Sequence, residues 1–129
     1  MKRRNIYSGS PFEAQIGFSR AVRSGRFIAV AGTAPIAPNG ATAYPGDASG
    51  QARRCLEIIE KAVNEAGGEL TDIIRTRIYV TDMSRWEEVG RAHGEFFSDI
   101  RPASTLVEVK GLARPDWLVE IEADCLVSE

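Results

Sequence analysis

The spacing of apolar residues changes several times along this chain of 129 residues, and each change predicts a new element. The clearest element is a helix that Asp47 caps and Gly67-Gly68 ends, because apolar residues between them recur at spacings of three and four. A second helix is predicted to begin at a capping box of Ser84 and Glu87. Its apolar stripe contains Trp86, Val89, Phe96 and Phe97.

Runs of β-branched and apolar residues predict five strands. They cover residues 18–23, 26–31, 72–81, 103–110 and 117–127. In the last strand, apolar side chains alternate with a second set that includes three carboxylates, and a strand points such alternating sets to opposite faces of its sheet. The apolar face holds Trp117, Val119, Ile121, Ala123, Cys125 and Val127, and the other face holds Leu118, Glu120, Glu122, Asp124 and Leu126.

These elements follow one another in the order ββαβαββ, within a single domain of residues 1–129. Residues 1–15 are predicted to be an irregular N-terminal segment, because Ser8-Gly9-Ser10-Pro11 is typical of a loop. Strands with helices on one side indicate an α+β fold, a two-layer sandwich. The other face of the sheet then has no helix over it, and a second subunit is the usual cover for such a face.

Composition disfavours several classes of function. The net charge is −2, and without a basic patch nucleic acid is not favoured as a partner. No apolar run has the length of a signal peptide or of a membrane span, so a cytoplasmic protein with no membrane partner is expected. Cys55 and Cys125 both fall on apolar faces, which predicts buried, reduced thiols. Two separated cysteines and one histidine do not make a metal site, and no cofactor is expected.

Several polar groups remain as candidates for chemistry. The three carboxylates of the last strand need cations nearby, and Arg75 and Arg77 share one face of the middle strand. Either these charges form ion pairs on a wet sheet face or at a subunit seam, or they line a polar pocket between subunits with one working carboxylate. The backbone of Gly32-Thr33-Ala34 either offers N–H groups to an anionic ligand or simply ends a strand. His93 is interpreted as a surface or interface residue rather than a general base.

Five segments, taken in order, resemble the RidA/YjgF family from about residue 16 to the end. Residues 18–36, FSRAVRSGRFIAVAGTAPI, are similar to its opening hairpin and SGQxP-type turn. GDASGQARRCLEIIEKAVNEAGGELTDIIRTRIYVTDM is similar to its first helix, linker and middle strand, and EEVGRAHGEFF to its second helix. RPASTLVEVKGL and LVEIEADCLV resemble its signature strand and closing strand.

The resemblance implies a chorismate-mutase-like fold and a homotrimer whose three sheets line a central barrel, with the helices outside. It also implies three clefts between subunits. In the active branch of the family, these clefts hydrolyse reactive enamines and imines. An arginine in the signature strand holds the carboxylate of the substrate there, and a glutamate on the closing strand helps to position water.

The match to the active branch is partial. Glu120 stands at the position of the glutamate, which makes it the candidate catalytic residue, and Gly32, followed by Thr33, keeps the glycine of the turn. Ser104, followed by Thr105, occupies the position of the arginine. The other departures are Phe18 for a tyrosine of the first hairpin, Gly90 for an asparagine of the second helix, and His93 for a nearby tyrosine.

Arg77 is the candidate to replace the missing cation, unless it merely neutralises Glu122 or Asp124. The expected protein is therefore a homotrimer whose pockets bind a small molecule, expected to be a carboxylate, and in which Glu120 orients water for hydrolysis of an imine or related bond. The usual deaminase activity is in doubt because of Ser104. The alternatives are a ligand-binding or interaction protein without activity and, with less support, an endoribonuclease.

Overall fold

The computed structural model describes residues 2–128, and its centre is one six-stranded mixed sheet with strand order β1-β2-β3-β6-β4-β5. The strands are β1 (Arg3–Ile6), β2 (Ala21–Ser24), β3 (Phe27–Thr33), β4 (Ile73–Val80), β5 (Ala103–Glu108) and β6 (Val119–Leu126). Neighbouring strands are antiparallel except β4 and β5, which run parallel. The strand β5 therefore forms one free edge of the sheet.

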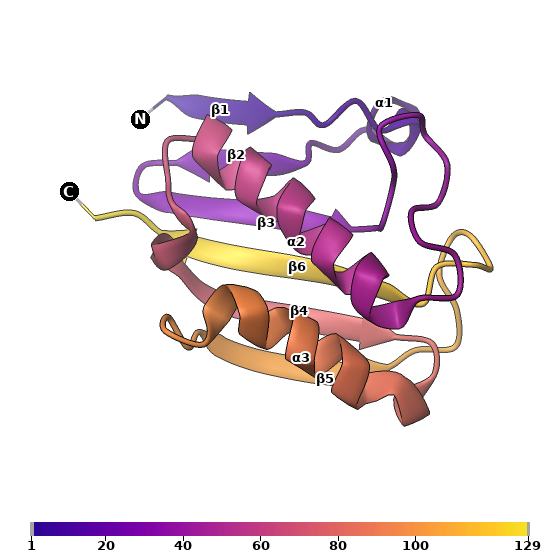
Figure 1. Cartoon of the computed structure of the whole chain (residues 1–129). Helices are drawn as coiled ribbons and strands as arrows, with labels where there is room; N and C mark the ends of the chain where they lie inside the picture. Colours follow the sequence, from indigo (N-terminus) through magenta and orange to yellow (C-terminus); the bar gives the residue numbers. More distant parts are fainter. Residues whose placement is uncertain (1, 129) are drawn as a thin grey trace.

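Both long helices lie on the same face of the sheet (Figure 1). The helix α2 (Ala48–Glu65) crosses the half of the sheet that contains β3 and β6, and α3 (Trp86–Phe97) lies over β4 and β5. The apolar stripe predicted for α2 is buried, from Ala52 through Cys55, Leu56, Ile59, Ala62 and Val63 to Ala66. The side chain of Asp47 caps this helix by accepting a hydrogen bond from the backbone N–H of Gly50, as predicted.

The alternation predicted for the last strand is confirmed. Val119, Ile121, Ala123 and Cys125 are buried under the helices, while Glu120, Glu122 and Asp124 point to the face that no helix covers. We call this second face the open face. Paired residues of neighbouring strands share a face, so the register puts Arg77 and Tyr79 of β4 on the open face as well.

The N-terminal segment differs from the prediction of an irregular region. It contains β1 and the short helix α1 (Pro11–Ile16), so these two elements precede the predicted ββαβαββ order. Ser10 caps α1 through its side chain, which accepts from the backbone N–H of Phe12, and Pro11 occupies the first turn. Polar composition hid both elements, although a serine followed by proline is a common way to begin a helix.

The beginning of α3 also differs from the prediction. Asp82, rather than Ser84, caps a short 3-10 turn (Met83–Arg85) that leads directly into the helix at Trp86. Trp86 is half exposed and lies off the buried stripe, which instead contains Val89, Ala92 and Phe97. None of the helices within residues 2–128 is both long and apolar enough to span a membrane.

Candidate functional site

Glu120 lies against the backbone of Gly32, where β6 and β3 meet at the end of the sheet. A Cβ atom added to Gly32 would stand 2.5 Å from Oε1 of Glu120, so this position has room for the carboxylate only because it is glycine. The register of β3 against β6 shifts between Val30 and Thr33, which places this close contact at an irregularity of the ladder. The sequence therefore brings together two of its predicted site residues here.

The carboxyl of Glu120 is partly buried, and burial raises its pKa. The negative charge of Glu122 also raises this pKa, while the positive charge of Arg20 lowers it. A carboxyl with a raised pKa exchanges a proton more readily near neutral pH than an exposed one does. Glu120 is thus suited to accept a hydrogen bond from a water molecule or to transfer a proton.

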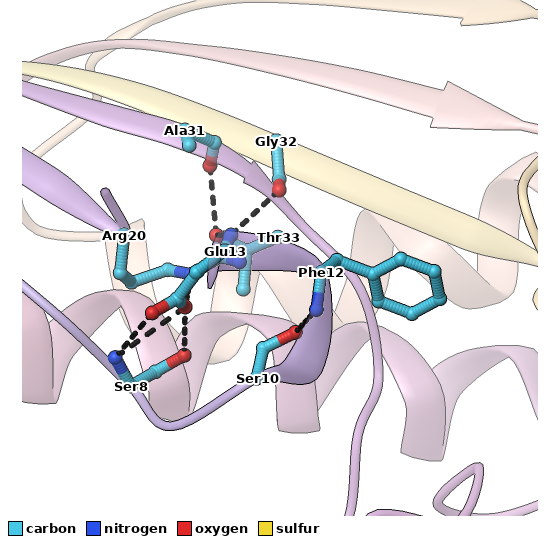
Figure 2. A network of polar contacts seen from close by, with 8 residues as sticks. All are labelled: Ser8, Ser10, Phe12, Glu13, Arg20, Ala31, Gly32 and Thr33. Atoms are coloured by element: carbon cyan, nitrogen blue, oxygen red, sulfur yellow. Dashed lines mark hydrogen bonds and ion pairs between the residues drawn. The ribbon is translucent and has the colours of Figure 1, made fainter. Parts of the chain in front are cut away.

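A buried ion pair is bonded to the end of β3 at Gly32 and Thr33 (Figure 2). Nε of Arg20 donates to Oε2 of Glu13 at 3.1 Å, and both side chains are almost fully buried. Nη1 of Arg20 also donates to the carbonyl oxygen of Gly32 (2.6 Å) and to Oγ1 of Thr33 (3.2 Å). The Glu13 carboxylate further accepts the backbone N–H and the hydroxyl of Ser8. This network was not predicted from the sequence, because Glu13 falls in the segment predicted to be irregular.

Thr33 and Phe18 border this region in different ways. Thr33 is buried, and its hydroxyl donates to the carbonyl of Ala31 (2.8 Å), so its side chain is occupied within the protein. Phe18 lies beside the guanidinium of Arg20, whose Cζ is 5.3 Å from the ring centroid. Phe18 also lines a shallow depression of about 720 Å³ on the open face, together with Ala29, Ala31, Glu122 and Asp124.

The open face carries the predicted ion pairs. Nη1 of Arg77 lies 3.3 Å from Oδ2 of Asp124 and 3.8 Å from Oε1 of Glu122, and Nε of Arg75 lies 3.9 Å from Asp124. The hydroxyl of Tyr79 donates to Glu122, which raises the pKa of Tyr79. Arg77 therefore neutralises these two carboxylates, which is one of the two roles predicted for it. Thr105 is its neighbour in the parallel ladder and is exposed.

Ser104 lies on the other face of the sheet, at the edge strand β5. Oγ1 of the buried Thr76 donates to Oγ of Ser104 (2.8 Å) and also lies 2.9 Å from Nε2 of His93. His93 is partly buried on the inner side of α3, stacked near Phe97 with ring centroids 4.6 Å apart, and burial lowers its pKa. Of the two predicted locations, surface or interface, the partly buried ring does not fit a fully exposed surface position. The spacing of four residues from Val89 to His93 and from His93 to Phe97 is the signal that could have shown its inward position.

Gly90 lies on α3 three residues before His93, and a Cβ there would meet only the ring of Trp86, at 4.0 Å. The predicted residues thus form two groups. Glu120 and Gly32 lie at the open face between β3 and β6, whereas Ser104 of β5 lies on the helix-covered face near His93 of α3. Gly90 belongs to the same helix as His93. Within one chain the sheet separates Ser104 from Glu120, so Glu120 is not placed to pair with a cation at position 104.

A further cleft of the described chain is bordered by Thr33 but by none of the residues of these two groups. It measures about 460 Å³ and lies between α2, the N-terminal segment and the loop after β3, with Tyr7, Ile36, Arg54 and Lys61 among its lining residues. Within residues 2–128, no three His, Cys, Asp or Glu side chains gather as a metal site would require. Cys55 and Cys125 are buried and unpaired, and burial raises the pKa of both thiols, that of Cys125 to about 12.

A mixed six-stranded sheet with both long helices on one face and charged side chains on the other defines a small α+β protein. The family model described as Endoribonuclease L-PSP matches residues 9–127. The chain therefore belongs to the RidA/YjgF family.

Individual relatives agree with this assignment. The chain is 36% identical over 106 residues to a RutC family protein of Pyrococcus horikoshii, covering 82% of this chain and 83% of that protein. It is 34% identical over 101 residues to the 3-aminoacrylate deaminase RutC of Acinetobacter baylyi, covering 78% and 79%. The crystal structure of Rv2704 from Mycobacterium tuberculosis, a member of the YjgF/YER057c/UK114 family, superposes with a TM-score of 0.89 at 48% identity, covering 98% of this chain and 100% of that one.

Proposed function

We propose that three copies of this chain form a trimer whose inter-subunit clefts bind a small metabolite, and that Glu120 orients water there for hydrolysis of an imine or related bond. The observation that carries this proposal is the seat of the Glu120 carboxylate over Gly32. The separation of Ser104 from Glu120 by the sheet supports a site built from two subunits. In such a site the β5 edge of one copy meets the open face of the next.

Hydrolysis of an imine needs few groups from the protein. Water adds to the carbon of a C=N bond, a proton moves to the nitrogen, and the product breaks down to a carbonyl compound and ammonia. A partly buried carboxylate can accept a hydrogen bond from the attacking water and return the proton to the leaving nitrogen. The raised pKa of Glu120 suits both steps.

Hydrolysis of substrates that carry a carboxylate is expected to be weak. Ser104 supplies no charge, and Arg77 is already held by Asp124 and Glu122. A bidentate contact between a guanidinium and a carboxylate contributes about 1.5–3 kcal/mol. Its loss reduces transition-state binding roughly tenfold to a few hundredfold.

Turnover of a panel of imines tests the proposal, with 2-iminopropionate compared side by side against a family member that carries the arginine. We expect slow but measurable hydrolysis that Glu120→Gln abolishes. Glu122→Gln is the matched control, since Glu122 is on the same strand and face but is already bound to Tyr79. Equal loss in both variants, or a rate equal to that of the arginine-bearing protein, would contradict the assigned roles.

A binding protein without activity is the second candidate, and the missing cation at Ser104 favours it. It predicts saturable binding of small polar molecules with no turnover of any imine. The net charge of −2 gives no support to cleavage of RNA. We also propose a cytoplasmic location, which the two unpaired cysteines support.

A further inference from the structure

The side chains of Ser104, Thr76 and His93 form a continuous chain of hydrogen bonds from the surface into the protein. Ser104 is exposed at the β5 edge, Thr76 is fully buried, and His93 is partly buried on the inner side of α3. The two links measure 2.8 Å from Thr76 to Ser104 and 2.9 Å from Thr76 to His93. We call these three residues the relay.

The hydrogen bonds of the relay can point either outward, toward Ser104, or inward, toward His93. When Nε2 of His93 carries a hydrogen, it donates to Thr76, Thr76 donates to Ser104, and the hydroxyl hydrogen of Ser104 is free to point outward. When Nε2 is unprotonated, both hydroxyl hydrogens point inward, and Ser104 presents only lone pairs. A neutral imidazole has both tautomers, so the exposed hydroxyl can act as donor or as acceptor without any change of charge.

No charged side chain contacts the relay within the described chain. None of the ion pairs or hydrogen bonds there brings one to Ser104, Thr76 or His93. Arg75 and Arg77 lie on the opposite face of the sheet, paired with Asp124 and Glu122. Arg101, just before β5, donates to the carbonyl of Ser98 instead (3.1 Å). The pKa of His93 is lowered by burial alone, with no contribution from a neighbouring charge.

We propose that the relay binds an uncharged carboxamide group of the ligand, in the place where a cation would otherwise select a carboxylate. A carboxamide has one carbonyl acceptor and two N–H donors, and the hydroxyl of Ser104 can match either end. A carboxylate can only accept, and it loses its water in a closed cleft without a cation to compensate. This inference rests on the proposed inter-subunit pocket and names the class of ligand it takes.

Pyruvamide and pyruvate are the probes, because they differ only in the group that the relay would contact. Their dissociation constants are measured by ligand-observed NMR on the intact protein, wild type and variants alike. Wild type is expected to bind pyruvamide at least about 10-fold more tightly than pyruvate, which is the effect of about one hydrogen-bonded contact. Ser104→Ala should reduce this preference to less than about 3-fold, and Ser104→Arg should reverse it.

His93 supplies a second readout, since it is the only histidine of the chain and its ring signals need no assignment. Pyruvamide should shift the imidazole ¹⁵N signals of wild type although the ligand contacts only Ser104. The shift should persist in Thr76→Ser, which keeps the hydroxyl, and vanish in Thr76→Val, which keeps the shape but breaks the relay. The persistence of folded trimer in both Thr76 variants is checked by chromatography.

The outcomes distinguish failure of the proposed pocket from failure of the carboxamide site alone. If wild type binds neither probe, the pocket and the carboxamide site both fail. If pyruvate binds as tightly as pyruvamide, or if Ser104→Ala keeps the preference, the pocket stands and the carboxamide site is wrong. A ring shift that survives in Thr76→Val would show that His93 senses the ligand without the relay, which also overturns the inference.

Discussion

At the scale of single residues, the proposed function depends most on the contact between Glu120 and Gly32. Replacing Gly32 by alanine places a Cβ 2.5 Å from Oε1 of Glu120, so the flexible end of the glutamate must move. We expect Gly32→Ala to reduce the turnover of imines by at least about 10-fold while the melting temperature changes little, because a displaced catalytic group costs orders of magnitude in rate.

Gly94→Ala is the matched control for this change. Nothing lies within 4 Å of a Cβ at Gly94, which is inside α3, so alanine there should leave the rate unchanged and stabilise the fold by about 0.5–1 kcal/mol. Full activity in Gly32→Ala would mean that the seated carboxylate is not the working conformation of Glu120.

His93 should make stability depend on pH in a defined window. Burial lowers its pKa below the ordinary value of 6.5, so the unfolded chain binds a proton more readily than the folded protein does. The stability contributed by neutral His93 is complete above about pH 6.5 and decreases as the pH falls toward its folded pKa. Glu120 has the opposite effect on the free energy of unfolding. Its raised pKa favours proton uptake by the folded state, so a falling pH increases its contribution to stability.

Urea unfolding at pH 7.5 and pH 5.5 tests this, with His93→Gln as the variant because its amide can still donate to Thr76. The free energy of unfolding should fall more between the two pH values in wild type than in the variant, and the difference isolates His93 from Glu120. An identical decrease in both proteins would show that His93 titrates in the folded state as it does in the unfolded chain.

At the scale of elements, the buried pair of Glu13 and Arg20 joins the helix α1 to the chain at the start of β2. Removing the carboxylate in Glu13→Gln leaves the guanidinium buried without a counter-charge, and such changes cost about 3–5 kcal/mol. Chemical denaturation should show this loss. Glu95→Gln is the control, because the Arg53–Glu95 pair is exposed at 42% and 50%, and solvent screening should make its loss far less costly. Equal effects would mean that α1 is held by other contacts.

Elements with a strong period could be predicted from the sequence, and those that depend on context could not. The face assignments of β6 and the boundaries of α2 follow from alternation and from capping by Asp47, which are local properties. The helix α1 is only six residues long, and its one buried side chain is the charged Glu13. Its burial depends on Arg20, seven positions further along the chain, so no local apolar pattern could show it.

At the scale of the whole molecule, the candidate site could be predicted only as a set of residues. Sequence resemblance selected Ser104 and Glu120, but their separation by the sheet follows from the parallel pairing of β5 with β4, in which Ser104 stands opposite Thr76. No spacing within either strand reports that pairing. The relay was missed for the same reason, because Thr76, His93 and Ser104 belong to three different elements.

The protein is predicted to form a trimer, because the open face of the sheet exposes apolar side chains that neighbouring subunits would cover. Phe27 and Leu126 are paired across β3 and β6 and are each 44% exposed, on a face that also holds Arg77 among carboxylates. Light scattering at micromolar concentration should report about 42 kDa, three times the 14.1 kDa of one chain. Leu126→Glu places a charge among these apolar side chains and should shift the protein toward monomer, whereas Lys61→Glu, on the outer surface of α2, should not. A wild-type protein of 14.1 kDa in solution would leave the open face without a partner, and the two halves of the proposed site could then not meet.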